Sequence, residues 1–167
     1  ITIDPFLQRF TNLTQLGFRF GNLPSIDLSS NPLLKILVIG NDFDTQIKGL
    51  STLTQLEFLG VTGTIENLNL AMHPELYHVS LRGHKMQLNE LSQINLDANV
   101  YLENVSITNN SLSQIDLSNN TALTSLNLYA NFIEELDLTQ QSQLEYLDLS
   151  SVFLKQVAAP QSLYAIT

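Results

Sequence analysis

Three histidines lie close together in the segment HPELYHVSLRGH, as His73, His78 and His84. Imidazole nitrogen is a common zinc ligand, and a structural zinc site in a protein uses about four side chains, a catalytic one about three. The segment is a metal site only if all three rings point to one place. That condition depends on the elements that carry them.

A second set of residues, Glu57, His78 and Ser80, offers a carboxylate, an imidazole and a hydroxyl. On adjacent strands, about 5 Å apart, these groups would resemble the trio of a hydrolase. Acyl transfer also needs an oxyanion hole of exposed backbone N–H groups and a pocket that excludes water. A paired sheet has already used its N–H groups, so we predict no catalysis here. Glu57 is instead expected to form a weak surface ion pair with Arg82 or His78.

A third pattern is a recurring acidic or amide residue between two aliphatic ones, at Asp27, Asn69, Asn95, Asp116 and Asp137. Stacked carboxylates could hold calcium, and Asp42 and Asp44 pose the same question. Asp and Asn side chains also cap turns by accepting backbone N–H groups. The sequence favours turn capping for both sets.

The elements that position these residues follow from an internal repeat, whose units begin at Leu13, Leu34, Leu53, Leu76, Leu102, Leu123 and Leu144, with a truncated eighth at Leu163. Each unit opens with an L-x-x-L-x-L segment, and its period of two indicates a very short strand with one buried face. Such strands are stable only when successive units stack, which joins their leucines into one core. The repeat predicts a mostly β solenoid of about seven units, one domain over residues 1–167, with little or no helix.

Two units carry a complete motif, LENVSITNNSL at residues 102–112 and LTSLNLYANFI at residues 123–133. They resemble the leucine-rich repeat family, whose conserved segment reads L-x-x-L-x-L-x-x-N-x-L. The companion halves IDLSN and LDLTQ look like the short-unit bacterial type, with about 21 residues per repeat and an extended convex side. The resemblance covers Leu13 to Val157 and implies a concave parallel sheet. In the family the asparagine bonds neighbouring turns, and only Asn110 and Asn131 hold that place here, so other groups must fill it elsewhere.

The same motif assigns the segments that open each unit to the concave sheet. In this register Gln55, Glu57 and Leu59 face outward from the third strand. Units are regular from residue 102 onward, whereas every glycine and every length change lies earlier, with loops expected at 42–46, 61–64 and 84–90 on one rim. Insertions on one rim often build a binding edge. The predicted ligand-binding residues are Arg19, Phe20, Glu57, Leu59, His78, Arg82, Tyr129 and Tyr146.

The register also separates the three histidines. His73 falls in a turn from the convex side, His78 points out of the concave sheet, and His84 occupies the inward asparagine column. Ligands aimed in three directions cannot share a zinc ion. We therefore predict no metal and no cofactor.

Composition excludes several partners. Seven basic against sixteen acidic residues give a net charge of −9, which repels nucleic acid and anionic membrane surfaces. No apolar run approaches the roughly 20 residues that cross a bilayer, so no membrane insertion is expected. The absence of cysteine excludes disulfides and thiol nucleophiles.

The resemblance implies a non-catalytic recognition module of a secreted or surface bacterial protein, which binds a protein partner through its concave face. The alternative is a carbohydrate-binding module that recognises a polysaccharide, possibly attached to a glycan-active enzyme. Tyr129 and Tyr146, whose anchors are about 14 Å apart on neighbouring strands, could contact an extended sugar chain. Because the chain begins within a unit, we expect it to be linked to further repeats or domains.

Overall fold

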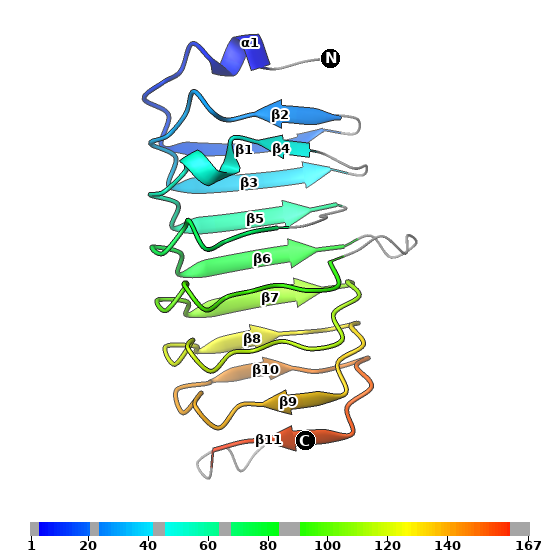
Figure 1. The fold of residues 1–167 in the computed structure, drawn as a ribbon. Coiled ribbons are helices and arrows are strands. Elements are labelled where there is room, and N and C mark those ends of the chain that lie inside the picture. Colours follow the sequence, from blue (N-terminus) through cyan, green and yellow to red (C-terminus); the bar gives the residue numbers. More distant parts are fainter. Residues whose placement is uncertain (1–3, 21–23, 42–45, 64–67, 84–90, 161–167) are drawn as a thin grey trace.

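The computed structural model describes residues 4–20, 24–41, 46–63, 68–83 and 91–160. Their backbone forms a coil of short strands and turns, stacked unit upon unit from the N-terminal to the C-terminal end (Figure 1). The predicted parallel β-solenoid is therefore confirmed. Within the described residues, no helix is long and apolar enough to cross a membrane.

One seven-stranded parallel sheet runs the length of the solenoid and is the predicted concave sheet. Its strands, in spatial order, are β1 (Gln15–Phe20), β3 (Ile36–Asn41), β5 (Phe58–Thr62), β6 (His78–Arg82), β7 (Asn104–Thr108), β8 (Ser125–Asn127) and β10 (Tyr146–Asp148). Each unit contributes one strand, because the L-x-x-L-x-L segment alternates buried and outward side chains.

The return path of each unit forms the opposite side. Two short parallel pairs lie there, β2 (Ser25–Asp27) with β4 (Gln46–Lys48), and β9 (Glu135–Asp137) with β11 (Gln156–Ala158). The described helical structure is one short helix, α1 (Asp4–Leu7), and one 3₁₀ turn, η1 (Leu50–Thr52).

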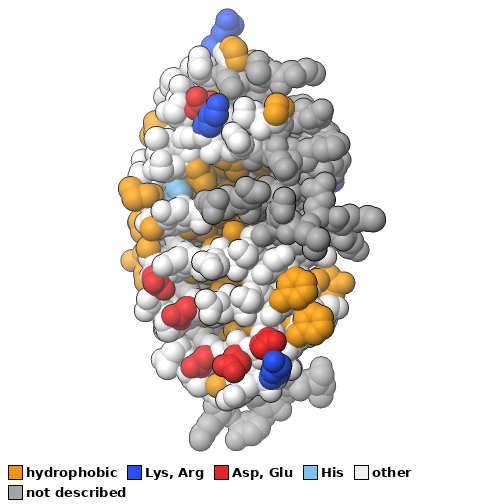
Figure 2. All heavy atoms as spheres, turned by 45° about the vertical axis from the view of Figure 1, so that its right-hand side comes forward, with side chains coloured by type: hydrophobic (Ala, Val, Ile, Leu, Met, Phe, Trp, Pro, Cys, Tyr) orange, Lys and Arg blue, Asp and Glu red, His pale blue; other side chains and the backbone are white. Residues whose placement is uncertain are grey.

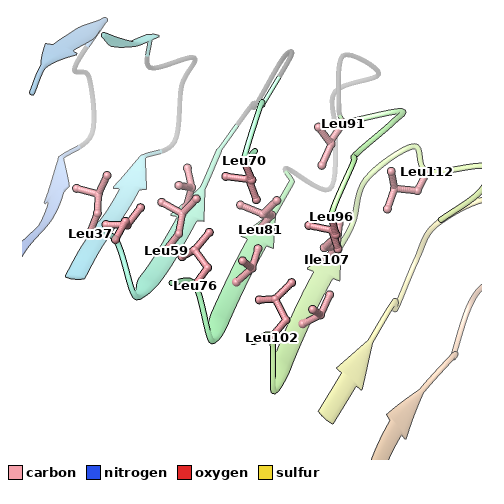
Figure 3. Packing of buried hydrophobic residues seen from close by; sticks show 14 of the residues in the cluster. Leu37, Leu59, Leu70, Leu76, Leu81, Leu91, Leu96, Leu102, Ile107 and Leu112 are labelled. Atoms are coloured by element: carbon pink, nitrogen blue, oxygen red, sulfur yellow. The ribbon is translucent and has the colours of Figure 1, made fainter. Parts of the chain in front are cut away.

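The core fills the space between these two sides. Leu37, Leu59 and Val79 come from successive strands, lie in register and are fully buried. Leucines of the return segments, such as Leu70 and Leu96, point into the same core from the other side (Figure 3). Each buried aliphatic side chain contributes about 1.5–3 kcal/mol relative to exposure, so the stacked leucines stabilise strands that are too short to persist alone.

The register of the third unit differs from the prediction. The sequence LTQLEFLGV offers two overlapping frames, one beginning at Leu53 and one at Leu56. The structure adopts the second, in which Leu56, Leu59 and Val61 are all buried and Phe58, Gly60 and Thr62 face outward. This frame is preferred because Leu53 is also buried, in the preceding turn, so that no leucine is lost to solvent.

The expected asparagine bonds form where the motif is complete. Asn131 accepts the backbone N–H of Leu112 at 3.2 Å and donates to the carbonyls of Ile107 and Leu128 at 2.7 and 2.9 Å. Asn110 makes the matching bonds to Leu91 and Leu81. These contacts satisfy buried backbone groups that would otherwise cost about 1–3 kcal/mol each.

A second column of buried polar residues stands three residues before the opening leucine of five units. It comprises Asn31, His73, Asn99, Asn120 and Gln141. The Nδ2 atom of Asn120 donates to the carbonyls of Leu96 and Asn99, at 3.1 and 2.9 Å, and so ties one turn to the turn before it. This column joins successive units at the rim where the concave strands begin, and it was not predicted from the sequence.

The turn-capping interpretation of the acidic column is confirmed. Asp27, Asn69, Asn95, Asp116 and Asp137 each accept the backbone N–H two residues ahead. Hydrogen bonds from Ser29 lower the pKa of Asp27, and those from Thr139 lower the pKa of Asp137. Among the residues that the structure describes, no group of three or more His, Asp or Glu is arranged to hold a metal ion. Asp42 and Asp44 lie outside the described residues.

Candidate ligand-binding hollow on the concave face

The sheet register sorts the outward side chains of the first four strands into three rows. The row at the start of the strands contains Ile36, Phe58 and His78, the middle row Gly17, Val38, Gly60 and Ser80, and the row at their end Arg19, Gly40, Thr62 and Arg82. Neighbours within a row are about 4.8 Å apart. None of these outward residues is acidic.

A hollow of about 340 Å³ lies over these strands, between β1 and β6. Gly17, Gly40 and Gly60 form much of its floor, since each lacks the side chain that would fill the space. The volume is at the lower end of the roughly 300–1,000 Å³ found for ligand pockets. The hollow is open to solvent and large enough for a side chain of a partner.

An aromatic wall bounds the hollow on one side. The rings of Phe58 and His78 stack with centroids 4.1 Å apart and planes 8° apart. A Cβ atom at Gly60 would lie 3.3 Å from Cε1 of Phe58 and 3.6 Å from a methyl group of Val38, so both side chains lean over this glycine. Val38 is 40% exposed, which leaves an apolar contact surface in the centre of the sheet.

Arg19 bounds the other side. Its side chain lies flat across Gly40, with Nε 3.0 Å and Cγ 3.2 Å from the position that a Cβ atom there would take. Arg82 lies in the same row on β6, three strand spacings away. Both side chains are exposed, and neither forms an ion pair with any residue that the structure describes. Their positive charges are therefore available to a ligand.

His78 adds a neutral ring to this site. Burial lowers the pKa of His78 from its ordinary value, because the charged imidazolium loses hydration against the Phe58 ring and the sheet. At neutral pH the ring is uncharged. The positive charge of the site therefore comes from the two guanidinium groups.

The trio of Glu57, His78 and Ser80 does not form a triad. Glu57 precedes β5 and pairs with Lys35 at 2.6 Å, so the predicted ion pair with Arg82 or His78 is wrong. The error follows from the register of unit three, which moves Glu57 from the centre of the face to the rim where the strands begin. Both partners are well exposed, and the pair contributes at most about 1 kcal/mol.

Of the other predicted site residues, Arg19 and His78 line the hollow and Arg82 borders it. Leu59 was wrongly predicted, because it is fully buried between Leu37 and Val79. Phe20 ends β1, and its side chain is not among the described ones.

The two tyrosines lie over the other half of the sheet. Tyr146 begins β10 and is 51% exposed, whereas Tyr129 follows β8 and is partly buried. The structure does not bring them to the hollow.

Sequence reasoning missed Phe58, Gly60 and the role of Val38. The signal was present as glycines near the same place in successive units, at Gly17, Gly40 and Gly60. Of the predicted rim loops, residues 61 and 62 belong to β5, whereas 42–45, 64–67 and 84–90 lie outside the described residues.

His73 has a structural role. It is fully buried, and its Nδ1 donates to the carbonyl of Leu53 at 3.0 Å, in the place that asparagine takes in neighbouring units. Burial lowers its pKa, which keeps the ring neutral. His73 and His78 thus face different parts of the molecule, as predicted, and His84 lies outside the described residues.

No family model matches the chain, and no curated protein matches it. Among solved structures, it is similar to the functional domain of InlJ from Listeria monocytogenes, which includes a cysteine ladder. The TM-score is 0.61 at 24% sequence identity, over 87% of this chain and 36% of that one. The likeness is one of fold. The chain is a parallel β-solenoid with a leucine core. It contains no cysteine, and its buried columns consist of asparagine, histidine and glutamine.

Proposed function

We propose that this chain is a non-catalytic leucine-rich repeat module that binds a protein partner through its concave face. The observation that carries the proposal is the hollow over β1 to β6, which combines a glycine floor, an aromatic wall and the guanidinium group of Arg19, with Arg82 beside it. Neither arginine forms an ion pair with a described residue. A paired sheet holds these groups rigidly, so little conformational entropy is lost on binding.

We also propose that residues 1–167 are one domain of a longer secreted or surface protein of a bacterium. Two facts support this. The fold is similar to that of a bacterial protein domain, and the chain spans only 36% of the length of that structure. Stacked repeats create extended concave surfaces that such proteins use for binding.

Selection from a displayed library of natural protein fragments tests this function. Fragments retained by the chain should bind Gly60→Leu at least tenfold more weakly, because the new side chain fills the floor between Phe58 and Val38. Ser125→Leu, an outward position on β8, is the matched control and should retain binding. If every retained fragment binds both variants as it binds the original chain, the concave hollow is not the binding surface.

A carbohydrate-binding function is the second candidate, and it draws on a different surface. Phe132 and Phe153 are 51% and 64% exposed, and their rings are parallel within 3° with centroids 5.8 Å apart. Hydrophobic side chains gather in the open on the lower half of the molecule, beside acidic ones (Figure 2). Affinity electrophoresis with neutral polysaccharides tests this candidate: retardation that Phe153→Ser abolishes supports it, and no retardation excludes the polysaccharides tried.

A further inference from the structure

The charge of the molecule is unevenly distributed, and this bears on what the hollow binds. Residues 1–83 contain five basic and seven acidic side chains, whereas residues 84–167 contain two and nine. The outward positions of β1, β3, β5 and β6 include two arginines and no acidic residue. Among the described residues, the strands that form the hollow are therefore locally basic on an acidic protein, which favours negative charge in the ligand.

The spacing of the two arginines limits the shape of that ligand. Arg19 and Arg82 stand in one row on the first and fourth strands, which places their anchors about 14 Å apart. An extended peptide that crosses the strands rises about 3.3 Å per residue, so side chains four residues apart span about 13 Å. Residues i, i+2 and i+4 of such a peptide point to the same side.

The middle of the hollow complements the residue between the two charges. Half-way between Arg19 and Arg82 in their own row lie Gly40 and Thr62. The apolar surface of Val38 and the bare backbone of Gly60 lies in the next row, about 7 Å along the strands. Exposed apolar area of this kind gains free energy when a partner covers it. A long apolar side chain at position i+2, such as that of phenylalanine, would extend from the row of the arginines to Val38 and Gly60, while carboxylates at i and i+4 meet the guanidinium groups.

We propose that the hollow recognises an extended acidic peptide segment with the pattern Asp/Glu-x-apolar-x-Asp/Glu. This inference rests on the proposed protein-binding function and specifies its ligand. Arginine suits the role because its guanidinium group forms charge-assisted, bidentate bonds with carboxylates. The neutral His78 and the Phe58 ring contribute contact area without further charge.

The probe is a fluorescein-labelled peptide containing Glu-Ser-Phe-Ser-Glu, with binding measured by fluorescence anisotropy at low ionic strength. The chain should bind it at least tenfold more tightly than Glu-Ser-Ser-Ser-Glu, Lys-Ser-Phe-Ser-Lys, or a version with the two glutamates adjacent. Affinity should fall as salt is added, because the carboxylate contacts are exposed and therefore screened. Equal binding of the adjacent-glutamate version overturns the proposed spacing.

Protein variants identify the contacts. Arg19→Gln and Arg82→Gln should each weaken binding about tenfold, as expected for loss of a hydrogen bond to a charged group. Lys155→Gln removes the same charge from an exposed position outside the hollow and should bind as the original chain does. If Lys155→Gln weakens binding as much as the arginine variants, the attraction is non-specific and the proposal is wrong.

An acidic polysaccharide is the competing ligand. If polygalacturonate binds in a manner that both Arg19→Gln and Gly60→Leu abolish, and the Glu-Ser-Phe-Ser-Glu peptide does not bind, the hollow is a glycan site and the peptide proposal is overturned. The fragment selection described above separates this result from failure of the proposed function. Fragments that depend on the hollow but lack the acidic pattern would leave protein binding in place and contradict only the pattern.

Discussion

The two ends of the concave sheet share one leucine frame and present different surfaces. Strands β1 and β3 contain six residues each, whereas β8 and β10 contain three. In the short strands the residue that belongs to the middle outward row is Asn127 or Asp148. The Oδ1 atom of each accepts the backbone N–H two residues ahead, at 3.0 and 2.9 Å. In β1 and β5 that position is glycine, which offers no such acceptor. A side chain that accepts a nearby backbone N–H competes with the hydrogen bonds of the sheet, so the strand ends earlier.

The same comparison applies to the turns that follow the strands. Asn109, Ala130 and Ser151 have φ angles of 53°, 55° and 59°, whereas the corresponding residue after β5 is Gly63. Left-handed backbone costs an L-residue about 1–2 kcal/mol, and glycine adopts it freely. The regular half therefore carries backbone strain that the first half avoids. The repeated structure of this half is stabilised by its leucine and asparagine columns and not by its turns.

The largest expected effect tests the register that creates the hollow. Leu59→Ala should lower the free energy of unfolding by about 2–5 kcal/mol, because it opens a cavity between Leu37 and Val79. Phe58→Ala, at the adjacent outward position, should cost much less. Thermal or urea denaturation measures both. If the two substitutions have equal effects, the outward row of β5 is wrongly assigned and the hollow does not exist as described.

An intermediate effect concerns pH. His73 occupies the position that Asn99 and Asn120 occupy in later units, and burial lowers its pKa below the ordinary value of 6.5. The unfolded chain therefore binds a proton at His73 more readily than the folded chain does. The free energy of unfolding is unaffected by this titration above about pH 6.5 and falls as the pH drops below that value. His73→Asn removes this titration and should show a smaller drop in Tm between pH 7.5 and pH 5.5. Identical Tm profiles for the two proteins would show that His73 is not buried as a neutral ring.

The smallest effect concerns the strained turns. Ala130→Gly should raise the free energy of unfolding by about 0.5–1 kcal/mol, because relief of the left-handed strain exceeds the entropy that glycine adds to the unfolded chain. Ala122→Gly, at a half-buried position without this φ angle, should lower stability and serves as the control. Chemical denaturation resolves differences of this size. A destabilised Ala130→Gly would contradict the claim that the turns of the regular half are strained.

The positions of the site residues were predictable from the sequence except in unit three. Arg19, His78 and Arg82 were placed correctly on the concave face because their units contain only one possible leucine frame. Leu59 was misplaced because LTQLEFLGV contains two frames, and a period of two gives no local reason to choose between them. The choice depends on burying all four apolar residues at once, which involves the neighbouring units.

The polar columns illustrate the same limit. Asn110 and Asn131 were recognised because they complete a known motif, whereas the burial of Asn31, Asn99 and Asn120, which precede the motif, was not predicted. Their amides bond carbonyls more than twenty residues away in sequence. Only the stacking of units brings these groups together.

By itself, the sequence determined the repeat, the parallel solenoid and the side of the unit that forms the long sheet, because periodic burial of leucine is a local property of the chain. The tertiary structure alone decided the frame of unit three, the stack of Phe58 on His78, and the way Arg19 lies across Gly40. These depend on side chains of different units that meet only across paired strands. A binding surface on a solenoid consists of side chains from several units, so its chemistry depends on the register in which their strands pair.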